Sequence, residues 1–324
     1  MHIFAILEQL RQQAQADDNI LLERVISRYL AIVKRLQGRV DALGLWIDSQ
    51  EQLTSAAVES SPQFKALLAE YEAEMQDYSS WLTTELRAEV IRSGEAGMIA
   101  GISILAAALG ESPEALNTPG INALDALNAY LENGSPLMER IRNMAAFGAD
   151  LIRSIILDGA GVGKGSAKIT ADIIEGGFGI SLTDAMRWTR TLQNYSYRWA
   201  NLSSYEANGI TAWIWWAELD ERVCASCVSL HGKLFPISDG VANDHHNGRC
   251  AMIPYIEGVT VVNPNAGQEW FDAQTEQAQK DIMGIGKWSA YQNGKFTFDQ
   301  LSTTYEDDVF GTMRREATLQ ELIT

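Results

Sequence analysis

Hydrophobic residues recur at helical spacing through the first two hundred residues of the chain. One stripe, with members three or four residues apart, consists of Leu22, Ile26, Tyr29, Val33 and Leu36. This spacing puts the side chains on one face of an amphipathic helix and predicts that residues 1–200 are mostly helical. A more uniformly apolar run, AGMIAGISILAAALG, spans residues 96–110. We expect a buried helix there, because the run is shorter than the about 20 residues that cross a bilayer.

Several helix starts are marked by a serine that can cap the first turn. A serine oxygen accepts a hydrogen bond from a free backbone N–H, and proline fits the first helical position. Three predicted starts have this pair: Ser61-Pro62, Ser112-Pro113 and Ser135-Pro136. A fourth start is predicted at Ser181, because Asp184 follows it at capping-box spacing. The helix that begins there is expected to run through Trp188 to Trp199.

The pattern changes after the Asn208-Gly209 turn signal. Residues 211–217, TAWIWWA, are short and aromatic and predict a strand. A second short strand is expected over 258–262, helices over 270–284, and a final helix over 318–323. The chain is therefore predicted to be an α+β protein, with a mostly helical region over residues 1–200 and a small α+β module over residues 201–324.

Composition and charge narrow the class of protein. Apolar residues make up 46% of the 324 residues, which excludes a disordered or collagen-like chain. The formal net charge of −17 argues against a protein that grips nucleic acid through its phosphates, because such binding needs a surplus of Lys and Arg. Residues 1–19 lack the basic and apolar regions of a secretory signal, so we expect none.

The candidate chemistry is concentrated in one short segment. All three cysteines and three of the four histidines lie between residues 224 and 250. An odd number of cysteines with a Cys-x-x-Cys pair indicates a reducing compartment and a metal site rather than disulfides. The spacing predicts one structural zinc ion with four ligands, which leaves no open position for catalysis. The predicted ligands are Cys224, Cys227, His245 and Cys250.

Alternatives to this ligand set stay open at this point. His246 could replace His245, since it precedes Cys250 by a similar interval, and His231 is a third candidate. Three buried cysteines with histidines facing solvent would also fit the composition, since free cysteine is often buried. The clustering of the residues favours the metal site.

The residues around the cysteines resemble the phage Mu F-like minor head protein family, also called phage head morphogenesis proteins. The stretch LDERVCASCVSLHGKLF (219–235) is similar to that family's D-x-R-x-C-x-x-C-x-x-L-x-G-x-x-F pattern. HHNGRC (245–250) followed by Pro254 is similar to its H-x-x-C-R-C segment, with a departure at Gly248, where the family often has cysteine. Weaker similarity lies upstream, over 185–194 with Arg190, Thr191 and Asn194 near one helix face, and downstream over 279–294.

This resemblance, over about residues 120–324, implies a non-enzymatic structural role. Such proteins are minor components of tailed-phage heads, associated with the portal vertex, and act in head assembly or DNA packaging and ejection. It implies binding to the portal protein and other head proteins, several copies per virion, and residence in the virion or, during assembly, the host cytoplasm. We expect residues 1–200 to bind the portal or another head protein. No specific nucleic-acid binding, membrane association or added C-terminal domain is expected.

Three other signals suggest different functions. GVGKGS (161–166) resembles a phosphate-binding loop, but Asp158 and Gly165 break the required pattern. Residues 244–247, DHHN, suggest an HNH-like metal-dependent nuclease, although no histidine follows His246 to complete such a site. The apolar run at 96–110 suggests a membrane-active ejected protein. Trp213, Trp215 and Trp216 are interpreted as core or interface residues rather than a base-stacking platform.

Overall fold

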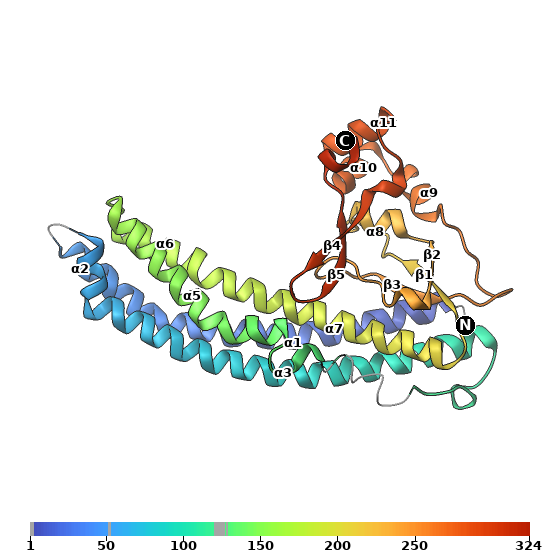
Figure 1. Ribbon diagram of the computed structural model, residues 1–324, viewed down its shortest axis with the longest axis horizontal. Coiled ribbons are helices and arrows are strands. Elements are labelled where there is room, and N and C mark those ends of the chain that lie inside the picture. Colours follow the sequence, from blue (N-terminus) through green and yellow to red (C-terminus); the bar gives the residue numbers. More distant parts are fainter. Residues whose placement is uncertain (1–2, 51–52, 120–126, 128) are drawn as a thin grey trace. The chain divides into compact units, whose positions relative to one another are not determined.

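The computed structural model describes residues 3–50, 53–119, 127 and 129–324, with residues 3–19 and 180 as backbone only. Long helices dominate the first two-thirds of the chain, and short strands and helices follow (Figure 1). The helices are α1 (Ile3–Asp48), α2 (Ser55–Ser60), α3 (Pro62–Leu109), α5 (Pro136–Gly161), α6 (Ser166–Asp172), α7 (Gly179–Ala207), α8 (Ala225–Leu230), α9 (Ala266–Asp272), α10 (Glu276–Met283), α11 (Ile285–Gln292) and α12 (Leu319–Ile323). The strands are β1 (Ala212–Trp216), β2 (Leu234–Pro236), β3 (Ala251–Pro254), β4 (Ser302–Asp307) and β5 (Gly311–Glu316). This composition confirms the predicted α+β class.

The chain divides into two compact units that are not contiguous in sequence. One unit, called here the helical unit, comprises residues 16–88 and 130–190. The other, called the sheet unit, comprises residues 1–15, 89–129 and 191–324. The expected assignment of head-protein binding to residues 1–200 and of the Cys/His module to residues 201–324 stays a prediction.

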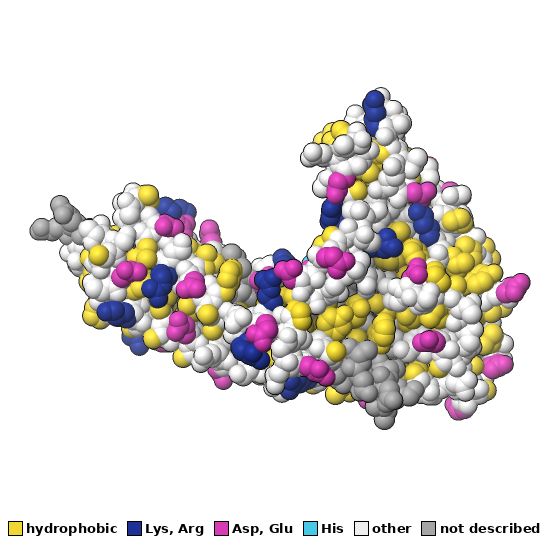
Figure 2. Space-filling view, viewed as in Figure 1, with side chains coloured by type: hydrophobic (Ala, Val, Ile, Leu, Met, Phe, Trp, Pro, Cys, Tyr) yellow, Lys and Arg dark blue, Asp and Glu magenta, His cyan; other side chains and the backbone are white. Residues whose placement is uncertain are grey.

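In the helical unit, α1 and α3 run antiparallel and are joined by ion pairs along their length. As residue numbers rise on α1, the partners on α3 fall, in the pairs Arg24–Glu85, Arg28–Asp77, Arg35–Glu74 and Arg39–Glu70. Exposed pairs of this kind contribute little stability each, so their regular order mainly sets the register of the two helices. On the face of the helical unit that Figure 2 shows, basic and acidic side chains are interspersed.

The core of the helical unit holds a group of buried tyrosines beside a π-helical turn at Ile173–Phe178. The Tyr29 hydroxyl donates to the Phe178 carbonyl at 2.8 Å, and the Tyr71 hydroxyl lies 3.3 Å from the hydroxyl of Ser181. Burial raises the pKa of both phenols. Each buried hydroxyl therefore has a polar partner, as a stable core requires.

In the sheet unit, the first three strands form an antiparallel sheet in the order β2-β1-β3. Trp213 lies opposite Phe235 on one side and Pro254 on the other. Because side chains alternate along a strand, Trp213 and Trp215 share one face with Phe235, and Ile214 lies on the other face. Trp213 and Trp215 are 1% exposed, which confirms that both belong to the core. β4 and β5 form a separate antiparallel hairpin.

Two glycines on α3 allow a close approach of α7 within the sheet unit. A Cβ atom at Gly97 would lie 2.2 Å from the carbonyl oxygen of Tyr197, and one at Gly101 would lie 2.7 Å from the Cβ of Ser204. α3 is also the one helix among the described residues that is long and apolar enough to cross a bilayer, and half of its apolar window is buried in the protein. Its glycines therefore serve helix packing.

Local signals predicted several helix ends correctly. Ser61 and Ser135 accept hydrogen bonds from the backbone N–H groups of Phe64 and Met138, as capping predicts. The C-terminal helix α12 has a complete capping box between Thr318 and Glu321. β1 and the Asn208-Gly209 turn are also where the sequence places them, with Gly209 at φ +74°.

Other predicted boundaries are wrong. Ser181 does not start a helix, since α7 begins at Gly179 and the Ser181 hydroxyl contacts Tyr71 instead. Ser112-Pro113 opens only a single 3₁₀ turn, Pro113–Ala115. Residues 258–262 form a turn rather than a strand, with Gly258 at φ +76°.

The predicted hydrophobic stripe of α1 is confirmed at Leu22, Tyr29 and Leu36, which are buried, and is wrong at its two other positions. Ile26 and Val33 are half-buried at its edge, whereas Val25 and Ile32 are fully buried at its centre.

Replacing Gly97 with alanine should destabilise the protein, because the new methyl group would meet the Tyr197 carbonyl at a distance that no packing tolerates. We expect Gly97→Ala to lower the free energy of unfolding by about 1–3 kcal/mol, measured by urea denaturation followed by circular dichroism. Gly38→Ala is the matched control, since nothing lies within 4 Å of its Cβ position; helix propensity should make it stabilising by about 0.5–1 kcal/mol. Equal effects at both positions would contradict the packing described.

Candidate metal centre

Cys224 and Cys227 are held one helical turn apart at the start of α8. Cys224 is the N-cap residue, and its sulfur accepts a hydrogen bond from the backbone N–H of Cys227 at 3.3 Å. All residues of α8 are buried, so the short helix is fixed by packing on both sides. Two sulfurs of a Cys-x-x-Cys pair thus face the same space.

His245 completes a three-residue group with these sulfurs. Its Nε2 lies 3.2 Å from Cys224 Sγ and 3.6 Å from Cys227 Sγ. Its other ring nitrogen, Nδ1, lies 2.9 Å from the carbonyl oxygen of His246. A proton on Nδ1 can be donated to that carbonyl, which leaves the Nε2 lone pair directed at the sulfurs. This is the arrangement in which histidine binds metals.

Cys250 reaches the cluster from the strand that follows the loop. It is buried and directly precedes β3, and its sulfur belongs to a second group with Cys227 and Asp244, whose candidate ligand atoms all lie within 4.8 Å of one another. The two groups share Cys227. The four residues that the spacing singles out therefore come together, and the cluster could hold a metal ion.

The other two candidate histidines lie elsewhere. His246 places Nε2 2.9 Å from Asp307 and Nδ1 3.3 Å from the hydroxyl of Thr191. His231 is 3% exposed, packs against Trp216 and contacts the backbone of Ala217 through Nδ1. Burial lowers the pKa of His231 to about 4, so it stays neutral. Both histidines have structural partners away from the sulfurs.

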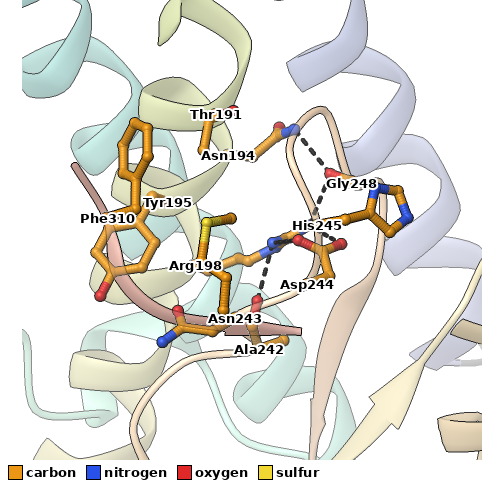
Figure 3. A pocket seen from close by; sticks show the side chains of 11 residues that line it. Thr191, Asn194, Tyr195, Arg198, Ala242, Asn243, Asp244, His245, Gly248 and Phe310 are labelled. Atoms are coloured by element: carbon orange, nitrogen blue, oxygen red, sulfur yellow. Dashed lines mark hydrogen bonds and ion pairs between the residues drawn. The ribbon is translucent and has the colours of Figure 1, made fainter. Parts of the chain in front are cut away.

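The loop that carries His245 is anchored to α7 by a buried ion pair. The Arg198 guanidinium contacts both carboxylate oxygens of Asp244, at 2.6 and 3.0 Å, and both side chains are almost fully buried. The same guanidinium donates to the carbonyl oxygens of Ala242 and Gly248, and Asn194 donates to Gly248 as well (Figure 3). Four contacts from one arginine thus define the path of residues 242–248.

Gly248 is the residue at which this loop allows no side chain. A Cβ atom there would lie 1.9 Å from an Asp244 carboxylate oxygen. Asp244 also accepts a hydrogen bond from the backbone N–H of Cys250 at 3.3 Å. Its carboxylate therefore occupies the space beside the cluster that a larger residue 248 would take.

A second arginine fastens the two cysteine-bearing segments to each other. Arg249 forms ion pairs with Glu218 and Asp220, which precede Cys224 in the chain. The hydrogen bonds from Arg249 lower the pKa of Asp220 to about 2. Asp220 also accepts from the backbone N–H of Arg222. These contacts fix the approach of the chain to Cys224.

The electrostatics of the cluster favour a charged sulfur. Hydrogen bonds from Cys227, and then the contact with His245, lower the pKa of the Cys224 thiol to about 5. The hydrogen bond with Cys224 in turn raises the pKa of His245 to about 10. Contacts with the two other sulfurs raise the pKa of Cys227. Without metal, these shifts pair a Cys224 thiolate with a protonated His245; a metal ion would displace the proton from Nε2, because metals bind the deprotonated sulfur and the neutral imidazole.

Sequence reasoning missed the residues that support the cluster. Arg198 did not stand out, although it follows Asn194 by four residues and so shares its face of α7, and Asp244 was noticed only as part of the DHHN segment and not as a partner of Arg198. Thr191 and Asn194, which were predicted to share a helix face, both contact the loop. The available signal was the four-residue spacing of Asn194 and Arg198 on α7.

The phosphate-loop reading of residues 161–166 finds no support in the structure. The segment joins α5 to α6 with no strand before it, and Lys164 pairs with Asp172.

Loss of Arg198 should cost far more stability than loss of an exposed arginine on the same helix. Arg198→Met leaves the Asp244 carboxylate buried without a counter-charge, so we expect the free energy of unfolding to fall by about 3–5 kcal/mol. Arg187→Met, which removes an exposed partner of Asp184, should change it by less than about 0.5 kcal/mol. Chemical denaturation of both variants measures the difference, and similar values would show that the buried pair does not hold the loop.

Comparison with known proteins identifies the segment that contains this cluster. Residues 150–253 match the family described as Phage Mu protein F like protein. The matched range runs from within α5 to β3 and includes all four cluster residues. No curated protein and no solved structure matches the chain significantly. Residues 150–253 of the chain are thus similar to the phage Mu F-like family, which confirms the resemblance seen in the sequence of this segment.

Proposed function

We propose that the chain is a structural head morphogenesis protein of a tailed phage, associated with the portal vertex, that acts in head assembly or in DNA packaging and ejection. The family match over residues 150–253 carries this proposal, because it covers the anchored Cys/His loop and the helix that holds it. The portal protein and other head proteins are its proposed partners. Several copies per virion and residence in the virion complete the proposal, with no membrane association.

The surface supports protein partners rather than nucleic acid. The chain carries 42 acidic against 25 basic residues, and many of its arginines are already paired with carboxylates. Binding to DNA phosphates needs unpaired cations on one face. A non-enzymatic role also agrees with the cluster, in which Asp244 and His246 are occupied by Arg198 and Asp307.

We propose that the cluster holds one structural zinc ion through Cys224, Cys227, His245 and Cys250. In a tetrahedral site with Zn–S near 2.3 Å and Zn–N near 2.1 Å, neighbouring ligand atoms lie about 3.6 Å apart. The distances of 3.2 and 3.6 Å from His245 Nε2 to the two sulfurs agree with that geometry. Three sulfurs and one imidazole nitrogen are a donor set that zinc prefers. When bound, the ion would join α8 to the 242–250 loop.

Zinc content should distinguish the two adjacent histidines. Purified protein should contain about one zinc ion per chain by mass spectrometry of metals, given four ligands in one closed site. His245→Ala should lose most of the metal, whereas His246→Ala, which removes the Asp307 contact, should retain it. A metal-free native protein, or metal loss in the His246 variant alone, would overturn the proposed ligand set.

Portal association should be visible during head assembly. We expect the chain to co-sediment with procapsids that contain a portal, and to be depleted from procapsids assembled without one. Gradient centrifugation followed by immunoblotting measures both. Equal incorporation without the portal would exclude the portal as the binding partner, and absence from both particles would contradict the head role.

A nuclease assay gives the competing reading a direct test. Duplex DNA should stay intact when incubated with the protein and Mg²⁺, Mn²⁺ or Zn²⁺. Cleavage that depends on added metal and disappears in His245→Ala would replace the structural role with the HNH-like nuclease.

A further inference from the structure

Arg314 on β5 differs from the other arginines of the sheet unit described above. Its guanidinium carbon lies 5.6 Å from the centre of the Phe235 ring and 5.9 Å from that of Trp215. No described residue accepts a hydrogen bond or forms an ion pair with its side chain. Burial lowers its pKa, and the nearby Asp239 carboxylate partly opposes that shift. An arginine side chain with five N–H donors is thus held on an aromatic support without an acceptor.

The neighbouring Arg315, unlike Arg314, has a carboxylate partner for its guanidinium. Arg315 contacts both carboxylate oxygens of Glu321, at 2.6 and 2.9 Å. Arg198 and Arg249 likewise have carboxylate partners. Lys233, which lies on the same strand face as Phe235, is paired with Asp299 at 2.6 Å. The guanidinium of Arg314 is therefore the free cation of this surface, as far as the described residues show.

Beside Arg314 the sheet ends in an edge strand. β2 pairs with β1 on one side and is the outer strand of the sheet. The backbone carbonyl of Lys233 accepts a hydrogen bond from the N–H of Trp215, and the backbone N–H of Ile237 donates to the carbonyl of Thr211. The odd-numbered residues of this segment therefore direct their backbone groups toward β1. In an antiparallel pair the intervening residues direct their N–H and C=O groups the other way. Leu234 thus offers both groups outward, and Pro236 offers its carbonyl. Leu234 is 45% exposed.

We propose that β2 and Arg314 form a docking site for an extended segment of a partner protein in which acidic and apolar residues alternate. The segment would add a strand beside β2, using the free backbone groups of Leu234 and Pro236. Because side chains alternate across a sheet, its residues on the Phe235 face would reach Arg314, and those on the other face would meet Leu234. An acidic residue therefore belongs on the first face and an apolar residue on the second.

The charge around the site favours a carboxylate on a protein over a phosphate backbone. Arg314 is one cation near the Asp239 carboxylate, Lys233 just before β2 is already paired with Asp299, and the chain as a whole is strongly acidic. A nucleic acid would bring a row of charges to a surface that offers one guanidinium. A single carboxylate can take the planar, two-bond contact that arginine provides. The short edge with Pro236 admits only a brief added strand, which limits aggregation.

Three labelled peptides test this proposal with the full-length protein. They are acetylated, amidated four-repeat peptides of Val-Glu, Val-Gln and Val-Lys, and binding is measured by fluorescence anisotropy. We expect saturable binding of the Val-Glu peptide and binding of the Val-Gln peptide that is about 10-fold weaker, since a charge-assisted contact is roughly twice as strong as a neutral one. The Val-Lys peptide should not bind.

Variants assign the binding to Arg314. Arg314→Met keeps the aliphatic contact with the rings and should weaken the Val-Glu peptide by about 10-fold. Arg315→Met, the matched control, should leave it unchanged. Arg314→Lys keeps the charge without the planar fork and should also weaken binding, which preserves the test if the Met variant does not fold by circular dichroism. Leu234→Pro removes the outward N–H and should reduce binding independently.

Several results would overturn the proposal. One is a Val-Glu peptide that shows no saturable binding, and another is a Val-Glu peptide that binds the wild-type protein and the Arg314→Met variant equally well. A third is a 20-base-pair DNA duplex that displaces the labelled Val-Glu peptide as strongly as the unlabelled peptide does. A dimer in sedimentation velocity that Arg314→Met abolishes would show that a second copy of this chain occupies the edge instead. The site is separate from the cysteine cluster, so failure here would leave the zinc content and procapsid association of the proposed function unaffected.

Discussion

One buried ion pair, Arg198 with Asp244, anchors the loop that carries the candidate metal-binding residues His245 and Cys250. Removing both charges from water is costly, and the cost is offset only when every donor and acceptor finds a partner. Here the guanidinium contacts two carboxylate oxygens and two backbone carbonyls, and the carboxylate also accepts from Cys250. The pair thus attaches residues 242–250 to α7 in one defined conformation.

The position of the candidate ligand atoms follows from this anchoring. His245 is the residue after Asp244, and its ring is oriented by the carbonyl of His246. Cys250 receives its backbone position partly from Asp244. On the opposite side, α8 places the other two sulfurs by a helix cap. The cluster is therefore positioned by a local helix cap on the side of Cys224 and Cys227, and by a long-range ion pair on the side of His245 and Cys250.

The local Cys-x-x-Cys and capping patterns could be predicted from the sequence, whereas the long-range ion pair of Arg198 could not. Cys-x-x-Cys spacing and serine caps act within four residues, so their outcome depends little on the rest of the chain, and Cys224, Cys227 and the cap at Ser135 agree with expectation. Ser181 had the same local signal but lies inside α7, where packing against Tyr71 prevails over capping. The partner of Arg198 lies 46 residues away, and no local pattern specifies it.

The hairpin of β4 and β5 was missed for a related reason. Its strands carry many charged and hydroxyl residues, STTYED and GTMRRE, and lack the run of branched or aromatic residues that marks β1. Only some of its side chains are buried, such as Met313. The hairpin is also bonded to a distant segment, since the backbone N–H of Arg314 donates to the carbonyl oxygen of Asn243.

The absence of a side chain at Gly248 has a consequence for variation among related proteins. Any larger residue there must displace the Asp244 carboxylate, and a displaced Asp244 leaves Arg198 charged and buried. Positions 198, 244 and 248 should therefore change together, as a set, rather than one at a time. A relative with a larger residue at the position of Gly248 would need other residues in place of the Arg198–Asp244 pair. Only a few combinations of residues at these three positions would then be compatible with the fold of the loop.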